Sequence, residues 1–135
     1  MVRNPEGFTL IEVMVVVVII GILAAIAIPK ITVMQDNARE ASLKENMHTF
    51  QLAIEDFAVK SGGTYPLAAD NVAVLANLPG GIWPKNPFTG VNGAPTWDAD
   101  PAAPGVLGAN PATTIGYSIK GYGRSALVPL ILTNG

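Results

Sequence analysis

An apolar run from Phe8 to Ile28, interrupted by one charged residue, most constrains what this chain can fold into. As a helix, about 21 residues at 1.5 Å each span roughly 31 Å, the thickness of a bilayer's hydrocarbon core. The β-branched stretch from Val13 to Ile20 disfavours a helix in water, but a strand crossing a membrane alone would leave its backbone polar groups unpaired. The run is longer than the apolar part of an ordinary secretory signal and no small-residue cleavage pattern closes it, so we expect one retained membrane helix.

Glu12 is the charged residue in that run. A carboxylate inside a membrane helix is costly, so a residue of this kind usually serves a function and has a partner. A proton relay would need a second ionisable group in the membrane, and a single span offers none besides Glu12. We therefore favour a role for Glu12 in assembly.

The segment from Lys30 to Lys60 predicts an amphipathic helix that continues the apolar one, so that Phe8–Lys60 forms a single helix of about 53 residues. Gly62 and Gly63 end it. Gly21 and Pro29 weaken the first half, and we expect a kink or local melting there. The predicted core-facing residues recur at spacings of three and four: Leu43, Met47, Phe50, Ile54 and Phe57.

The rest of the chain predicts a small head around this helix. Asp70 or Asn71 caps a short helix through Leu78. The Pro- and Gly-rich stretch 79–111 predicts loops or very short strands around Trp83, Phe88 and Trp97, and its segment Asp98–Ala112 is the most biased in composition. Two strands follow, one with alternating Ile115, Tyr117 and Ile119 and one from Ala126 to Leu132, joined by a turn at Gly121–Arg124; Pro129 indicates an edge position or a bulge. The predicted fold is α+β: a long amino-terminal helix packed against a small antiparallel sheet.

Several function classes find no support in the composition. The chain has 135 residues, a net charge of −2, no cysteine and one histidine, His48, so a zinc site or a thiolate nucleophile is excluded. No nucleophile elbow or phosphate loop occurs, and we expect no enzyme activity, no cofactor and no metal. Asp98 and Asp100 offer two carboxylates, whereas calcium needs six to eight oxygen ligands, so we favour a solvated loop there.

Basic and aromatic residues of the head leave one further alternative open. They could form a patch for DNA, although ordinary packing with solvated charges explains them better. The residues concerned are Lys85, Lys120, Arg124, Trp83, Trp97, Tyr117 and Tyr122.

The sequence Gly7-Phe8-Thr9-Leu10-Ile11-Glu12, followed by the apolar run and Pro29, closely resembles the amino terminus of type IV pilins and of the pseudopilins of type II secretion. The resemblance implies a class III signal peptide, in which a prepilin peptidase cuts after Gly7 and methylates the new amino terminus on Phe8. It also implies that Glu12 of one subunit neutralises the Phe8 amino group of another, and that the segment between Gly21 and Pro29 loses helicity in many assembled filaments.

This resemblance implies four parts: a leader, residues 1–7; a membrane and filament-core helix, residues 8–29; an amphipathic helix, residues 30–60; and a head, residues 61–135. The leading function is a structural subunit, the major pilin, of a type IV pilus. The first alternative is the major pseudopilin of a type II secretion system, which Gly63–Pro66 and Trp83–Pro87 resemble. The second is a membrane-anchored adhesive or binding module that never polymerises.

The implied partners and locations follow from the leading function. The precursor would be a single-pass protein of the inner (cytoplasmic) membrane, with its amino terminus in the cytoplasm. A prepilin peptidase, an inner-membrane platform and a cytoplasmic motor would then convert it into an extracellular homopolymeric pilus.

Overall fold

The computed structural model describes residues 7–113 and 116–134 and divides the chain into two units, Met1–Gln35 and Asp36–Gly135. A single helix, α1 (Leu10–Lys60, 51 residues), begins in the first unit and ends in the second. Its carboxy-terminal end is the predicted one. Gly62 and Gly63 adopt positive φ angles, and the Gly63 N–H donates to the Ala58 carbonyl at 2.8 Å, which satisfies one of the last carbonyls of the helix.

The part of α1 in the first unit buries none of its side chains. Its apolar side chains are exposed from Leu10 to Met34, and by length and composition the helix can cross a membrane. The helix is continuous through Gly21 and Pro29, so local melting is not present in the single chain, and the kink stays a prediction. At Pro29 the carbonyl oxygen accepts a hydrogen bond from the Thr32 hydroxyl at 2.8 Å. Loss of helicity in a filament stays a prediction.

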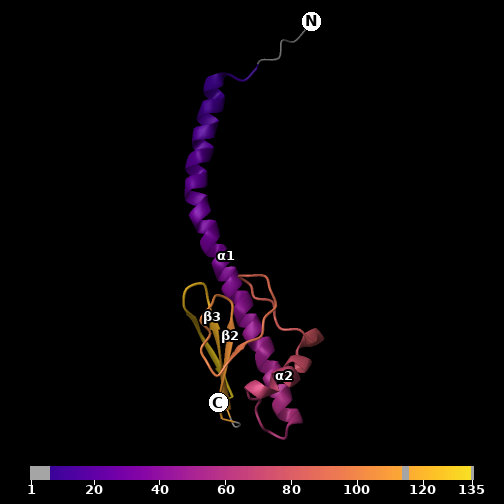
Figure 1. Ribbon diagram of the computed structural model, residues 1–135. Coiled ribbons are helices and arrows are strands. Elements are labelled where there is room, and N and C mark those ends of the chain that lie inside the picture. Colours follow the sequence, from indigo (N-terminus) through magenta and orange to yellow (C-terminus); the bar gives the residue numbers. More distant parts are fainter. Residues whose placement is uncertain (1–6, 114–115, 135) are drawn as a thin grey trace. The chain divides into compact units, whose positions relative to one another are not determined.

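The second unit contains a four-stranded sheet of order β1-β2-β3-β4, which Figure 1 shows alongside the second half of α1. The strands are β1 (Thr96–Trp97), β2 (Leu107–Thr113), β3 (Gly116–Tyr122) and β4 (Leu127–Thr133). Because β1 pairs with β2 in parallel and the other pairs are antiparallel, the sheet is mixed. The expectation of a purely antiparallel sheet is therefore wrong for its first pair, whereas the α+β class is confirmed.

Strand β2 was not predicted from the sequence. The segment Asp98–Ala112 was expected to be a loop, and this is wrong for its second half, where Leu107 and Ala109 are buried. Gly108 and Asn110 have low strand propensity, but hydrogen bonding to strands on both sides outweighs local preference. Gly108 is also required sterically, because a Cβ atom there would lie 2.4 Å from Pro101 Cδ.

The hairpin β3–β4 confirms the two predicted strands with a shifted turn. Gly121 belongs to β3, opposite Leu107, and the turn closes where the Gly123 N–H donates to the Ala126 carbonyl at 2.7 Å. The predicted strand residue Ile115 lies outside the described residues. Strand β4 is at the edge of the sheet, and Pro129 lies where its register against β3 shifts, as the proline predicted.

The core of the second unit forms between α1 and the inner face of the sheet. Four of the five predicted core residues, Leu43, Met47, Phe50 and Ile54, are fully buried, and Phe57 is partly buried against them. Gly121 gives the sheet its close approach to the helix, because a Cβ atom there would lie 2.9 Å from Met47 Sδ and 3.2 Å from Leu43 Cδ2.

A short helix, α2 (Asn71–Asn77), lies between two single-turn 3-10 helices, η1 (Ala68–Asp70) and η2 (Pro79–Gly81). The helix ends one residue before the predicted Leu78. Asp70 is its N-cap residue, as one of the two alternatives predicted, yet its carboxylate accepts from the Leu67 N–H at 2.9 Å instead of capping α2.

Candidate functional site

The start of α1 holds Glu12 in a local hydrogen-bonded ring with Thr9. The Thr9 N–H and the Thr9 hydroxyl both donate to Glu12 Oε2 at 2.7 Å, and the Glu12 N–H donates to Thr9 Oγ1 at 3.3 Å. This is a capping box, in which the N-cap Thr and the third helical residue satisfy each other's backbone donors. The Thr-x-x-Glu spacing is the signal that could have predicted it. A carboxylate here is also favoured by the positive end of the helix dipole.

The capping box uses one oxygen of the carboxylate. Within residues 7–113 and 116–134, Glu12 Oε1 has no hydrogen-bond partner, and the surface beside it is an open apolar one. Phe8 is 86% exposed on that surface. Glu12 therefore combines a locally satisfied oxygen with one that can accept a donor from outside the chain. The surface is lined by Phe8, Ile11, Glu12, Val15 and Val16.

The fold of the single chain does not explain why three further predicted site residues, Gly7, Gly21 and Pro29, are glycine or proline. A Cβ atom at Gly7 or Gly21 would meet nothing within 4 Å, and neither glycine needs a positive φ angle. Pro29 lies inside α1, where a proline removes one helical hydrogen bond. Gly21 costs about 1 kcal/mol relative to alanine in a helix interior. No contact among the described residues requires Gly7, Gly21 or Pro29.

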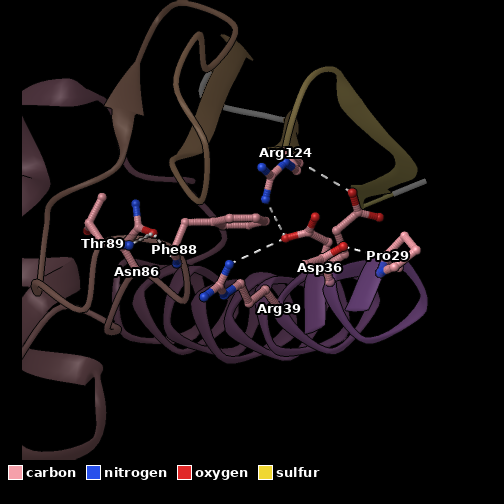
Figure 2. A network of polar contacts seen from close by, with 9 residues as sticks. Pro29, Asp36, Arg39, Asn86, Phe88, Thr89 and Arg124 are labelled. Atoms are coloured by element: carbon pink, nitrogen blue, oxygen red, sulfur yellow. Dashed lines mark hydrogen bonds and ion pairs between the residues drawn. The ribbon is translucent and has the colours of Figure 1, made fainter. Parts of the chain in front are cut away.

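The polar contacts of the head hold its loops to α1. Figure 2 shows Asp36 between Arg39 and Arg124, whose guanidinium groups lie 3.3 and 2.7 Å from the same carboxylate oxygen. The Arg39 guanidinium also lies 5.8 Å from the centroid of the Phe88 ring. The Arg124 N–H donates to Glu40 Oε1 at 3.5 Å, so two residues of α1 hold the β3–β4 turn.

Lys120, Arg124 and both tryptophans of the alternative DNA patch are engaged in such contacts. Lys120 pairs with Asp100 at 2.8 and 3.0 Å, and Arg124 pairs with Asp36. Trp83 and Trp97 pack edge-on against Phe50, with ring centroids 6.1 and 5.9 Å from it. These contacts favour ordinary head packing. DNA binding stays an untested alternative that they weaken.

Buried Tyr117 is hydrogen-bonded to a cluster of half-buried polar side chains. Its hydroxyl donates to Glu55 Oε1 and accepts from Gln51 Nε2 at 3.1 Å, while Tyr65 donates to the other oxygen of Glu55 at 3.2 Å. Burial, and then the hydrogen bond to Glu55, raise the pKa of Tyr117 to about 12. The cluster fastens β3 to α1, and its carboxylate is already occupied by two hydroxyl donors.

Asp98 and Asp100, the two carboxylates considered for calcium, have different surroundings. Asp100 accepts hydrogen bonds from Lys120 and from the Asn110 amide, so a lysine ammonium occupies it, while Asp98 is exposed with a positive φ of 60°. Across the described part of the chain, no group of three or more His, Asp or Glu residues is arranged to hold a metal ion. His48 is exposed on α1.

Comparison with known proteins identifies the amino-terminal segment. Residues 2–28 match the family model described as the prokaryotic N-terminal methylation motif. The chain carries a prepilin-type methylation motif. This motif covers Gly7, Phe8, Glu12 and Gly21, and it confirms the resemblance to type IV pilins and type II pseudopilins.

Three curated relatives include both a type II secretion protein and type IV pilins. The chain is 36% identical over 85 residues to type II secretion system core protein G of Pseudomonas aeruginosa, covering 62% of this chain and 59% of the relative. It is 49% identical over 56 residues to type IV major pilin protein PilA of Myxococcus xanthus, covering 40% of this chain and 26% of the relative. It is 50% identical over 40 residues to type IV narrow pilus major component PilA5 of Thermus thermophilus, covering 30% of this chain and 34% of the relative.

The chain thus matches less than two thirds of the length of each of these relatives. No solved structure matches it significantly.

Proposed function

We propose that the chain is a filament subunit, made as a membrane-anchored precursor, cleaved after Gly7, methylated on Phe8 and polymerised through the first half of α1. The observation that carries the proposal is the exposed apolar helix headed by Glu12. Burial of apolar surface stabilises association in proportion to the area removed from water. Both a bilayer and a bundle of identical helices can cover this surface, so the same segment serves as anchor and as filament core.

Glu12 supplies the specificity that hydrophobic burial lacks. Cleavage creates an ammonium group on Phe8, and Oε1 of a neighbour's Glu12 is open to accept it while Oε2 keeps its hydrogen bonds to Thr9. Removing both charges from water together is far less costly than burying either alone. The pair would fix the axial register of two subunits.

The role is structural, and the partners are those implied by the motif: a prepilin peptidase, an inner-membrane platform with its motor, and further copies of this chain. The proposed location is the inner membrane before assembly and the filament afterwards.

The filament could be a type IV pilus or the pseudopilus of a type II secretion system, and the matches to relatives of the two kinds differ in length. The match to core protein G covers 85 residues, which is longer than α1 and therefore includes part of the head, whereas the match to PilA covers 56. This supports a pseudopilin of a type II secretion system as strongly as the major pilin that the sequence favoured. Deletion of the gene decides: loss of long surface fibres with normal secretion supports a pilin, and loss of secretion without loss of surface fibres supports a pseudopilin.

A substitution at Glu12 tests whether the chain polymerises at all. Glu12→Gln keeps the acceptor of the capping box but removes the charge, so the precursor should accumulate normally while filaments are lost. Thr9→Ser is the matched control, since it keeps the cap and the charge. If Glu12→Gln leaves fibres and intersubunit crosslinks unchanged, the non-polymerising module becomes the better interpretation.

Mass spectrometry of the mature protein tests processing independently. Phe8 should be the first residue and should carry a methyl group. An intact Met1 in assembled fibres would contradict both cleavage after Gly7 and the ammonium that the Glu12 pair requires.

A further inference from the structure

Three charged side chains of α1, Lys30, Lys44 and Glu45, have no hydrogen bond or ion pair within the described chain, and of these Lys44 is half-buried whereas Lys30 and Glu45 are exposed. The structure describes every residue of α1, so its charges can be compared completely. Most are paired or hydrogen-bonded within the chain. The basic residues are Lys30, Arg39, Lys44 and Lys60, and the acidic residues are Glu12, Asp36, Glu40, Glu45, Glu55 and Asp56.

Glu45 is the acidic residue of α1 that has no partner. Glu12 accepts from Thr9, Asp36 from two arginines, and Glu40 from the Arg124 N–H. Glu55 accepts from two tyrosines, and Asp56 pairs with Lys60 at 2.6 Å. Glu45 makes none of these contacts and is exposed. Its charge is therefore free to meet one from another molecule.

Lys30 is the charged residue of α1 for which a partner would lower the free energy of assembly most. It is exposed and has no hydrogen bond or ion pair, and it directly follows the apolar segment that filament assembly would cover. In a bilayer, a lysine at the end of an apolar helix can extend its ammonium group to the interface. In a filament, helices of other copies would prevent the ammonium group from reaching water in this way. An unpaired charge buried among those helices would be strongly unfavourable.

We propose that Lys30 of one subunit pairs with Glu45 of a second copy of this chain. This rests on the proposed polymerisation and deepens it, because it names a second register contact besides Glu12. The two residues lie fifteen positions apart, so parallel copies shifted by about 22 Å bring them level. Pairing of Glu12 with Phe8 needs a shift of four positions, about 6 Å. The two contacts therefore join a subunit to different neighbours.

Charge reversal tests the pair in cells. Lys30→Glu and Glu45→Lys each place like charges opposite one another, and each should lower the yield of sheared filaments about tenfold or more. The double reversal restores the attraction and should return the yield to near the original level. Lys44→Glu is the matched control: it reverses the lysine next to Glu45 and should change the yield little. Precursor levels in the membrane fraction show whether any variant fails to accumulate.

Cysteine crosslinking tests the same contact directly, and the natural chain contains no cysteine to confuse it. With Lys30→Cys and Glu45→Cys in one chain, oxidation of assembled filaments should give a ladder of covalent multimers on a non-reducing gel. Either single variant can give a dimer at most. Lys30→Cys with Asp56→Cys is the control that should give no ladder.

The outcomes separate this pair from polymerisation itself. If Glu12→Gln abolishes filaments while both charge reversals leave them intact, the chain polymerises but Lys30 and Glu45 do not meet. Failure of the double reversal to restore filaments, or a ladder from the control cysteine pair and not from the test pair, would equally overturn the inference.

Discussion

Gly121 shows how one residue decides the fit between sheet and helix. Its strand passes so close to α1 that no side chain has room, and the neighbours of the missing Cβ, Met47 and Leu43, are fully buried. Buried side chains in a packed core yield little without strain. The glycine is thus part of the core although it contributes no side-chain surface to it.

Gly121→Ala should therefore destabilise the head by about 1–3 kcal/mol, because the added methyl group must displace Met47 or Leu43. Urea unfolding of the detergent-solubilised chain, followed by tryptophan fluorescence, measures the loss. Gly93→Ala is the control, since a Cβ atom there meets nothing within 4 Å and φ is not positive. Equal stability of the two variants would contradict the packing account.

Tyr117 gives the head a dependence on alkaline pH. The pKa of Tyr117 is raised to about 12 in the folded state, against about 10 in an unfolded chain. Stability linked to this residue is full below pH 10 and is lost as the pH rises toward 12, because the unfolded state then releases the proton more readily.

The expected difference is about 2 kcal/mol between pH 9.5 and pH 12. Tyr117→Phe should remove that component while costing about 1–2 kcal/mol at neutral pH through the lost hydrogen bonds of Glu55 and Gln51. Denaturant unfolding at several pH values gives both numbers. A Tyr117→Phe chain with the same alkaline dependence as the natural one would assign that dependence to other groups.

At the scale of elements, periodicity predicted α1 far better than it predicted the sheet. The spacing from Leu43 to Phe57 is a property of neighbouring turns, and the exposed glycines after Lys60 end the helix locally. Strand β2 depends instead on partners on both sides, β1 and β3, while its own Gly108, Asn110 and Pro111 resemble a loop. Long-range pairing of that kind leaves little trace in a single sequence.

The candidate site also contains features that the sequence predicted and features that it could not predict. Glu12 was evident from the sequence, because a charge in an apolar run is visible without any structure. Its capping bond to Thr9 was missed, although the Thr-x-x-Glu spacing contains it. The ion pairs Asp36–Arg124 and Asp100–Lys120 could not be foreseen, since the partners are distant in sequence.

The first half of α1 carries a prediction about filament mechanics. Gly21 and Pro29 weaken a helix that the single chain nevertheless keeps intact. If this segment loses helicity on assembly, Gly21→Ala with Pro29→Ala should favour the helix by about 3–4 kcal/mol and give filaments with continuous helical density there. Force spectroscopy should then show reduced extensibility. Continuous density through residues 21–29 in natural filaments would remove the melting interpretation.

At the scale of the whole molecule, the two units depend on different surroundings. Among the residues that the structure describes, every buried hydrophobic one lies between Leu43 and Leu132, so the second unit has a core of its own. The first unit has no buried residue among those described and needs a bilayer or other copies of the chain.

A fragment from Asp36 to Gly135 should consequently fold as a soluble monomer. Its near-UV circular dichroism should match that of the head in the full chain, because Phe50, Trp83 and Trp97 keep their contacts. Further truncation to begin at Met47 removes Leu43 and should abolish cooperative unfolding. An unfolded Asp36–Gly135 fragment would show that the head depends on the anchor.

Pro129 has a consequence for a cell that holds many copies of this chain close together. An exposed edge strand is a template on which strands of other molecules can add, and β4 is such a strand. The proline lacks an N–H group and coincides with the register shift against β3, so the edge is too irregular to recruit a second sheet. We therefore expect crowded heads to resist amyloid-like aggregation, so that the proposed self-association would involve only their helices.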